Sequence, residues 1–122
     1  VLQRVPIIPG KFEPTFRSLA VQEDLALKRL IMSEAKVLQI ADSYFTDKFA
    51  FMGVVAGLYA INGNVLPSHL DADNNFSDVL FRAKFEHLAR YSFWMLQSLC
   101  VHFGWFDARV KMCFKAENIK NG

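Results

Sequence analysis

The sequence predicts a mainly α single domain of about four to five helices, with an N-terminal extended arm or short strand. Its 122 residues make up one domain's worth of chain. Apolar residues recur with a helical period over most of the chain after residue 20. Three prolines within the first fourteen residues exclude a stable helix there. We therefore expect an extended arm over 1–19, a helical domain over 20–116 and a frayed tail over 117–122.

The arm carries two phenylalanines, Phe12 and Phe16, on the same side of an extended chain. Side chains alternate between the two sides of such a chain, so residues an even number apart share a side. The Pro9-Gly10 pair before them indicates a turn. We expect a short strand or arm that packs through these two rings, either on its own domain or on a neighbouring subunit.

The first two long helices are predicted over 21–32 and over about 44–61. The first has acidic residues in its first turn and basic residues near its end, as the helix dipole favours. The stretch 33–42 is ambiguous and also fits a second short helix. The later part of the helix over 44–61 is apolar on nearly every face, which is typical of a buried helix. Asn62-Gly63 is a suitable C-cap for it.

Gly53 and Gly57 stand four residues apart in this helix and indicate close packing against a neighbouring helix. The apolar run over 49–61 is shorter than the roughly 20 residues that a membrane-spanning helix needs. We therefore expect no membrane span. A polar loop is predicted over 64–75, after the helix ends.

Two further helices are predicted, one from a cap at Asn75 or Ser77 to about residue 91 and one over 93–116. The last helix carries two apolar rows. One of them should face the core, and the other is a candidate contact surface. The rows are Phe93, Leu96, Cys100, Phe103, Phe106, Val110 and Phe114 for the first, and Trp94, Val101, Trp105 and Met112 for the second.

The aromatic content is unusually high, with twelve Phe, three Tyr and two Trp. A small core can hold many of these rings but not all of them, so some aromatic surface is expected to meet a partner. Each candidate also fits ordinary core packing, which is the expected role of Phe106. The partner-contact candidates are Phe12, Phe16, Trp94, Trp105 and Phe106.

The sequence offers no catalytic set. It lacks a nucleophile elbow, a phosphate-binding glycine loop and a Cys-x-x-Cys pair. The three histidines are isolated from one another and from other metal ligands. The acidic stretch that starts at Asp71 lacks the glycine and the glutamate that a calcium loop needs. We therefore expect a non-enzymatic protein with no catalytic residue, no cofactor and no metal.

Charge, the start of the sequence and cysteine spacing exclude further classes of protein. The net charge is +2, and no run of Lys or Arg resembles a nucleic-acid arm, so nucleic-acid binding is not expected. No segment near the start has the long apolar core of a secretory signal. Cys100 and Cys113 fall in one predicted helix, about 20 Å apart, which is too far for a disulfide. Two reduced thiols are expected.

Six short segments spread over residues 9–114 occur in a recognisable order. They are Pro9-Gly10-Lys11-Phe12, Phe16-Arg17-Ser18-Leu19, Val21-Gln22-Glu23-Asp24-Leu25, Leu58-Tyr59-Ala60-Ile61-Asn62-Gly63, Leu66-Pro67 and Trp105-Phe106-Asp107-Ala108-Arg109-Val110. In this order they resemble the small tail proteins of contractile-tailed bacteriophages, in particular baseplate-hub and tail-assembly-chaperone-like proteins.

The resemblance implies a structural role in building the phage tail. Such proteins either sit in the baseplate or transiently shield the tape-measure protein, and they act through hydrophobic surfaces. The partners implied are other phage tail proteins (hub, tube or tape-measure protein), with a homo-oligomer as a further option. The implied location is the host cytoplasm during assembly and, for a permanent component, the tail or baseplate of the virion.

Two alternatives to the tail role stay open at this point. One is a peripheral membrane-binding domain that uses Trp94 and Trp105, although the last helix lacks a dense basic face. The other is a small ligand-binding domain with its pocket under the helix that carries Gly53 and Gly57.

Overall fold

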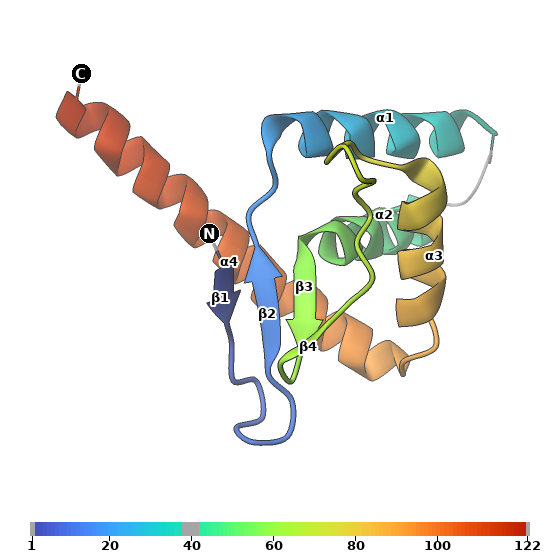
Figure 1. Cartoon of the computed structure of the whole chain (residues 1–122), viewed down its shortest axis with the longest axis horizontal. Helices are drawn as coiled ribbons and strands as arrows, with labels where there is room; N and C mark the ends of the chain where they lie inside the picture. Colours follow the sequence, from blue (N-terminus) through green and yellow to red (C-terminus); the bar gives the residue numbers. More distant parts are fainter. Residues whose placement is uncertain (1, 38–41, 122) are drawn as a thin grey trace.

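The computed structural model describes the backbone of residues 2–37 and 42–121 and the side chains of residues 2–34 and 48–113. Four strands form one antiparallel sheet in the order β1-β2-β3-β4. The fold is therefore mixed α and β, and the prediction of a mainly α domain is wrong. In chain order the elements are β1 (Leu2–Arg4), β2 (Pro14–Arg17), α1 (Val21–Val37), α2 (Asp42–Gly57), β3 (Leu58–Ile61), β4 (Asn64–Val65), α3 (Asp78–Leu88) and α4 (Phe93–Asn121) (Figure 1).

The predicted extended arm supplies two of the four strands. β1 pairs with β2, where Gln3 lies opposite Phe16, and β2 pairs with β3, where Phe16 lies opposite Leu58. The arm is thus built into the sheet beside a strand that follows α2. Phe12 and Phe16 are 8% and 0% exposed, so they pack on their own domain.

β3 replaces the last turn of the helix that we predicted over 44–61. α2 ends at Gly57, and the side chains of Leu58–Ile61 then alternate between buried and more exposed positions. Asn62 and Gly63 both have positive φ angles, 53° and 81°. These are the angles that the two central residues of a type I′ hairpin turn require. Asn-Gly therefore turns the chain from β3 into β4 instead of capping a helix.

The boundary between the first two helices also differs from the prediction. α1 continues past residue 32 to Val37, so the start of the ambiguous stretch 33–42 belongs to α1 and its last residue begins α2. The middle of that stretch, residues 38–41, lies outside the described residues.

α3 and α4 begin where the sequence places them. The side-chain oxygen of Ser77 accepts a hydrogen bond of 3.3 Å from the backbone N–H of Leu80 and caps α3. α3 then ends at Leu88, one turn earlier than predicted. α4 begins at Phe93 and continues past its predicted end to Asn121.

α4 packs across one face of the sheet, and in Figure 1 it passes behind β2 and β3. The ring centroids of Phe103 and Phe106 on α4 lie 5.6 and 5.8 Å from that of Phe16 on β2. A Cβ on Gly57 would collide with the Phe103 ring, whereas a Cβ on Gly53 would meet nothing within 4 Å. The expected close helix packing is confirmed for Gly57 alone.

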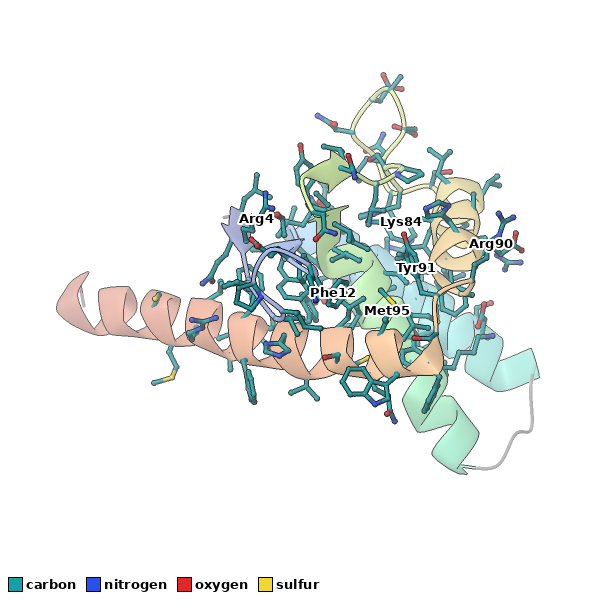
Figure 2. The ribbon with its side chains drawn as sticks, turned by 90° about the horizontal axis from the view of Figure 1, so that it is seen from below. Arg4, Phe12, Lys84, Arg90, Tyr91 and Met95 are labelled. Carbon is teal, nitrogen blue, oxygen red and sulfur yellow. The ribbon has the colours of Figure 1, made fainter. Side chains whose placement is uncertain are left out.

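The C-terminal half of α4 projects beyond the rest of the domain, as both Figure 1 and Figure 2 show. α4 is 29 residues long, and its N-terminal half is the part that lies against the sheet and α2. Within the described residues, no helix is long and apolar enough to cross a membrane, as the sequence analysis predicts.

Candidate functional site

One row of residues runs along the outward side of α4, and the spacing between its members alternates between four and three residues. The two tryptophans of this row, Trp94 and Trp105, are 70% and 59% exposed, and Met112 is 70% exposed. Apolar side chains with this spacing form one straight seam on a helix. We call this seam the outer row, and it consists of Trp94, Ser98, Val101, Trp105, Ala108 and Met112.

The opposite side of α4 packs into the domain. Leu99 and Phe106 are 0% and 1% exposed, and Leu96, Phe103 and Val110 are partly buried against the core. α4 therefore has two apolar faces, one inside the domain and one outside. The predicted inner row faces the core at Leu96, Cys100, Phe103, Phe106 and Val110. Phe93 of that row is instead 56% exposed, and the side chain of Phe114 lies outside the described residues. The second predicted row, Trp94, Val101, Trp105 and Met112, is exposed.

The five partner-contact candidates divide between these two environments. Phe12 and Phe16, the two candidates on the predicted arm, lie in the core of their own domain and not on a partner-facing surface, and Phe106 lies in the core as expected. Trp94 and Trp105 are the two that solvent reaches. Sequence reasoning did not include Ser98 and Ala108 in the exposed row, although their spacing completes it.

The flanks of the outer row carry no acidic side chain. Met95, His102 and Arg109 lie along one flank, and Gln97, Gly104 and Lys111 lie along the other. The His102 ring stands edge-on to Trp105 with a centroid distance of 4.9 Å. Lys111 is paired on its own helix with Asp107, at 2.8 Å between Nζ and Oδ2.

Two grooves adjoin the N-terminal end of the outer row. One lies between α2 and α4, has a volume of about 550 Å³, and is lined by Phe51, Phe93, Trp94 and Val101 among others. The rings of Phe51 and Phe93 meet edge to face across it, with a centroid distance of 6.0 Å. An apolar side chain from outside could enter this groove beside Trp94.

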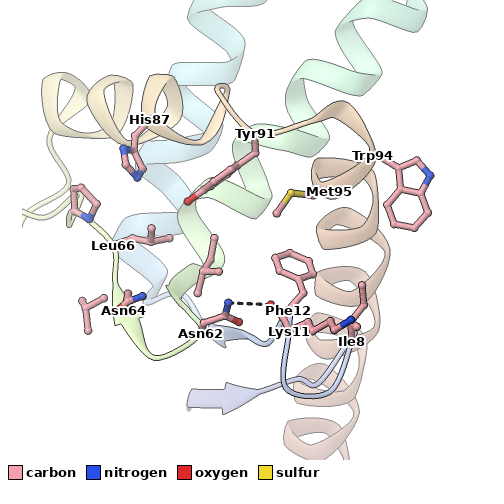
Figure 3. A pocket seen from close by; sticks show the side chains of 13 residues that line it. Ile8, Lys11, Phe12, Asn62, Asn64, Leu66, His87, Tyr91, Trp94 and Met95 are labelled. Carbon is pink, nitrogen blue, oxygen red and sulfur yellow. Dashed lines mark hydrogen bonds between the residues drawn. The ribbon is translucent and has the colours of Figure 1, made fainter.

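The other groove lies between the tip of the first hairpin, the β3–β4 turn and the start of α4 (Figure 3). Its volume is about 650 Å³, and its walls are mostly apolar, with Phe12, Tyr91 and Met95 facing inward. Asn62 fixes one wall, because its Nδ2 donates a hydrogen bond of 3.0 Å to the carbonyl of Lys11. In Figure 3, Trp94 points outward from the groove, toward the outer row.

A buried polar cluster lies between β2, α1, α3 and the loop that follows β4. Arg17 holds Glu23 with two hydrogen bonds, of 2.6 and 2.7 Å, one to each carboxylate oxygen. His69 Nε2 lies 3.1 Å from Glu23 Oε2. The carboxylate can only accept, so His69 donates from Nε2, and its Nδ1 is left as an acceptor.

Lys84 on α3 completes this cluster (labelled in Figure 2). Its Nζ donates a hydrogen bond of 2.7 Å to the carbonyl of Leu58 and lies 3.4 Å from His69 Nδ1. Lys84 is 2% exposed, and burial, followed by the charge of Arg17, lowers the pKa of Lys84 to about 7.

The other two buried titratable groups of the cluster are shifted in the same direction. Burial opposes ionisation of Glu23, but the hydrogen bonds from Arg17 and His69 outweigh it, and the pKa of Glu23 lies below its usual value. Burial also lowers the pKa of His69, and the charge of Lys84 adds to this effect. At neutral pH Glu23 is therefore a carboxylate and His69 a neutral imidazole.

Sequence reasoning missed this cluster. It treated His69 as isolated and did not single out Lys84. One signal was available, because Lys84 stands three residues after Phe81 and four before Leu88, on the apolar face of its helix. Among the described residues, no group of three or more His, Cys, Asp or Glu side chains could hold a metal ion.

No protein-family model, no curated protein and no solved structure matches the chain.

Proposed function

We propose that this chain is a non-enzymatic assembly protein that acts by helix–helix association along the outer row of α4. The occupant we assign to that row is α4 of a second copy of the chain. The observation that supports this is the exposed apolar seam itself, in which Trp94, Val101, Trp105 and Met112 are all at least half exposed. Exposed apolar seams of this size are typical of interaction surfaces.

The spacing of the row favours a helix as the occupant. Steps of four and three residues average 3.5, the repeat that keeps two helices in contact along a coiled coil. An extended peptide would instead match a surface with a period of two residues. The absence of acidic residues from both flanks also means that no flanking carboxylate needs to be buried.

The side-chain sizes favour an antiparallel pair of α4 helices. In a parallel pair each residue meets its own copy, so bulky tryptophans would meet each other in two layers, at Trp94 and at Trp105. In the antiparallel pair, every bulky ring meets a slimmer side chain. The layers are then Trp94 with Met112, Ser98 with Ala108, and Val101 with Trp105 of the second copy.

The projecting half of α4 supports the same arrangement. A helix in water without tertiary contacts is only marginally stable. The antiparallel pair lays the anchored half of each helix against the projecting half of the other. Met112 of the second copy then reaches the groove of about 550 Å³ between α2 and α4, beside Trp94.

The two exposed tryptophans supply part of the area that a specific dimer needs. The two tryptophans, 70% and 59% exposed, would together remove roughly 250 Å² per copy from water. This is about a third of the roughly 800 Å² that each partner contributes to a standard interface. Val101, Met112 and the residues that flank the row supply further area.

Sedimentation equilibrium of the full chain tests the association. We expect the wild type to form a dimer at micromolar concentration and Trp105→Glu to be monomeric, because the change buries a charge in the central layer. Val79→Glu is the matched control, since Val79 is 77% exposed on α3, away from the outer row. A wild type that stays monomeric at several hundred micromolar would overturn the proposal.

Disulfide trapping tests the orientation. In a background with Cys100→Ala and Cys113→Ser, a Ser98→Cys chain mixed with an Ala108→Cys chain should give a mixed disulfide. Each chain alone should not, because in the antiparallel pair the two copies of residue 98 lie about 15 Å apart along the axis. Efficient trapping of Ser98→Cys with itself would indicate a parallel pair and contradict the assigned orientation.

The tail-assembly role implied by the resemblance is the specific setting that we propose for this assembly function. It is tested by capture of the tagged chain from cells that express a complete set of contractile-tail genes, with tape-measure, hub and tube proteins identified by mass spectrometry. The proposal expects one of these three to be recovered with the wild type and with Val79→Glu. Recovery of none of them would remove the tail setting and leave the self-association to be judged by sedimentation.

A further inference from the structure

The buried ammonium group of Lys84 has no counter-ion among the described residues. Its Nζ contacts two neutral acceptors, the carbonyl of Leu58 at 2.7 Å and Nδ1 of His69 at 3.4 Å. The nearest carboxylate in the cluster, Glu23, has both of its oxygens occupied by Arg17. A neutral amine has two N–H groups and would be fully used by the two acceptors, whereas an ammonium has a third that needs another partner.

The titratable groups around Lys84 come from four other segments of the fold. Arg17 faces it from β2, Glu23 from α1 and His69 from the loop before α3, while Tyr59 lines the adjoining space from β3. With His69 neutral, the cluster holds two cations against one carboxylate when Lys84 is protonated. A buried positive charge in excess attracts an anion.

A small chamber adjoins this excess charge. Its volume is about 230 Å³, and Arg17, Lys84, His69 and Ser68 line it together with apolar residues of β3 and the loop after β4. The volume is below the 300–1,000 Å³ of sites for drug-sized molecules. The hydroxyl of Ser68 accepts a hydrogen bond of 3.0 Å from the backbone N–H of Leu70 and can donate its own proton into the chamber.

We propose that this chamber binds a small oxyanion, such as sulfate, phosphate or a short carboxylate, through Lys84 in its charged form with Ser68 and Arg17 beside it. The bound anion supplies the acceptor that the third N–H of Lys84 lacks. Since the free protein holds Lys84 near its point of half protonation at neutral pH, binding draws a proton onto this amine. Affinity should therefore increase as the pH falls from 8.5 to 6.5.

Isothermal titration calorimetry of the full chain with sulfate tests the site, because the charge of sulfate stays constant over this pH range. We expect saturable binding at one site, at least tenfold tighter at pH 6.5 than at pH 8.5, and proton uptake detected by comparing buffers of different ionisation enthalpy. Lys84→Met should abolish the binding. Lys28→Met, which changes an exposed lysine on α1, should leave it unchanged.

A second variant keeps the test valid if Lys84→Met does not fold. Ser68→Asp places a carboxylate in the chamber from an exposed position and should block sulfate by pairing with Lys84. Absence of saturable binding by the folded wild type at pH 6.5 would overturn the proposal. So would equal binding by Ser68→Asp. Trp105→Glu should bind sulfate as the wild type does, which separates this site from the association along α4.

Discussion

Lys84 on α3 donates a hydrogen bond of 2.7 Å to the backbone carbonyl of Leu58 on β3. The bond joins a helix to a central strand of the sheet. Both residues lie in the interior, since Lys84 is 2% exposed and Leu58 is fully buried. Lysine is rarely buried to this extent without a carboxylate partner. The fold thus keeps a titratable group at the contact between α3 and the sheet.

The first prediction concerns stability and pH. The unfolded chain holds the proton of Lys84 up to a pKa near 10.5, but the folded chain releases it at a pKa of about 7. The unfolded state therefore binds more protons between these values, and stability rises with pH through this window. We expect the free energy of unfolding to increase by about 2 kcal/mol between pH 7 and pH 9.

Urea unfolding at a series of pH values measures this rise. In Lys84→Met the rise between pH 7 and pH 9 should disappear, because the methionine does not titrate. An unchanged slope in that variant would assign the pH dependence to another group. Lys28→Met should keep the slope of the wild type, since Lys28 is exposed in its pair with Asp24.

The second prediction concerns the ion pair between Arg17 and Glu23. Glu23→Gln removes the carboxylate that accepts two hydrogen bonds from Arg17 and one from His69. Loss of one partner leaves the other charge partly buried and unpaired, which should cost about 3 kcal/mol in the free energy of unfolding. The neighbouring change Asp24→Asn breaks an exposed pair with Lys28 and removes a charge from the first turn of α1, and it should cost less than about 1 kcal/mol.

The same pair makes the protein sensitive to acid. The folded pKa of Glu23 lies below its usual 4.5, so its ionised form contributes stability above pH 4.5, and this contribution is lost as the pH falls through the folded value. Chemical unfolding at pH 5.5 and pH 3 should show a smaller difference between wild type and Glu23→Gln at the lower pH. A constant difference would mean that the carboxylate does not act through its charge.

The third prediction separates two glycines of α2. Gly57→Ala places a methyl group where the Phe103 ring lies, so the ring or the helix must move, at a cost of about 1–3 kcal/mol. Gly53→Ala meets nothing within 4 Å in the middle of the helix and should stabilise it by about 0.5–1 kcal/mol. Thermal unfolding of the two variants should thus move in opposite directions, and equal shifts would contradict the close contact at Gly57.

The fourth prediction concerns Asn62, which joins the two hairpins. Its Oδ1 accepts a hydrogen bond of 2.7 Å from the backbone N–H of Glu13, and its Nδ2 donates to the carbonyl of Lys11. Its φ of 53° also favours Asn over Ala. Asn62→Ala should therefore destabilise the fold by about 2 kcal/mol.

Asn64→Ala, on the exposed strand β4, is the control for this change and should alter the free energy of unfolding by less than about 0.5 kcal/mol. Amide hydrogen exchange gives a local readout. The N–H of Glu13 should exchange faster in Asn62→Ala than in Asn64→Ala. Equal protection in the two variants would show that the side chain of Asn62 does not hold the first hairpin.

Local signals were sufficient to predict most of the helices. The acidic start of α1, the Ser77 cap of α3 and the two apolar rows of α4 all depend on residues within one or two turns of each other. The exposed second row could be anticipated for the same reason. A helix has only one side against a sheet, so two wide apolar rows leave one uncovered.

Local signals could not distinguish the strand β3 from a continuation of helix α2. Leu58–Ile61 continues the apolar run of α2 without a break, and Asn62-Gly63 suits both a helix C-cap and a type I′ turn. What decides between them is pairing with β2, more than forty residues earlier in the chain. The helix was predicted too long because that partner is not a local feature.

The polar cluster could not be predicted from the sequence for a related reason. Arg17, Glu23, His69 and Lys84 come from four separate segments, and their approach depends on the completed sheet. A lysine on an apolar helix face indicates a buried ammonium only when its surroundings are known. The sequence could therefore locate the outer surface of α4 but not the interior site.

Phe16 has a consequence for the order in which the chain can fold as the ribosome makes it. Its strand pairs with β3 through Leu58, and its ring is covered by Phe103 and Phe106. During synthesis the first hairpin emerges long before either neighbour. The Phe16 ring must then remain uncovered until α4 has been translated, because α4 carries the two rings that cover it. A nascent chain stalled before α4 would present that ring to chaperones.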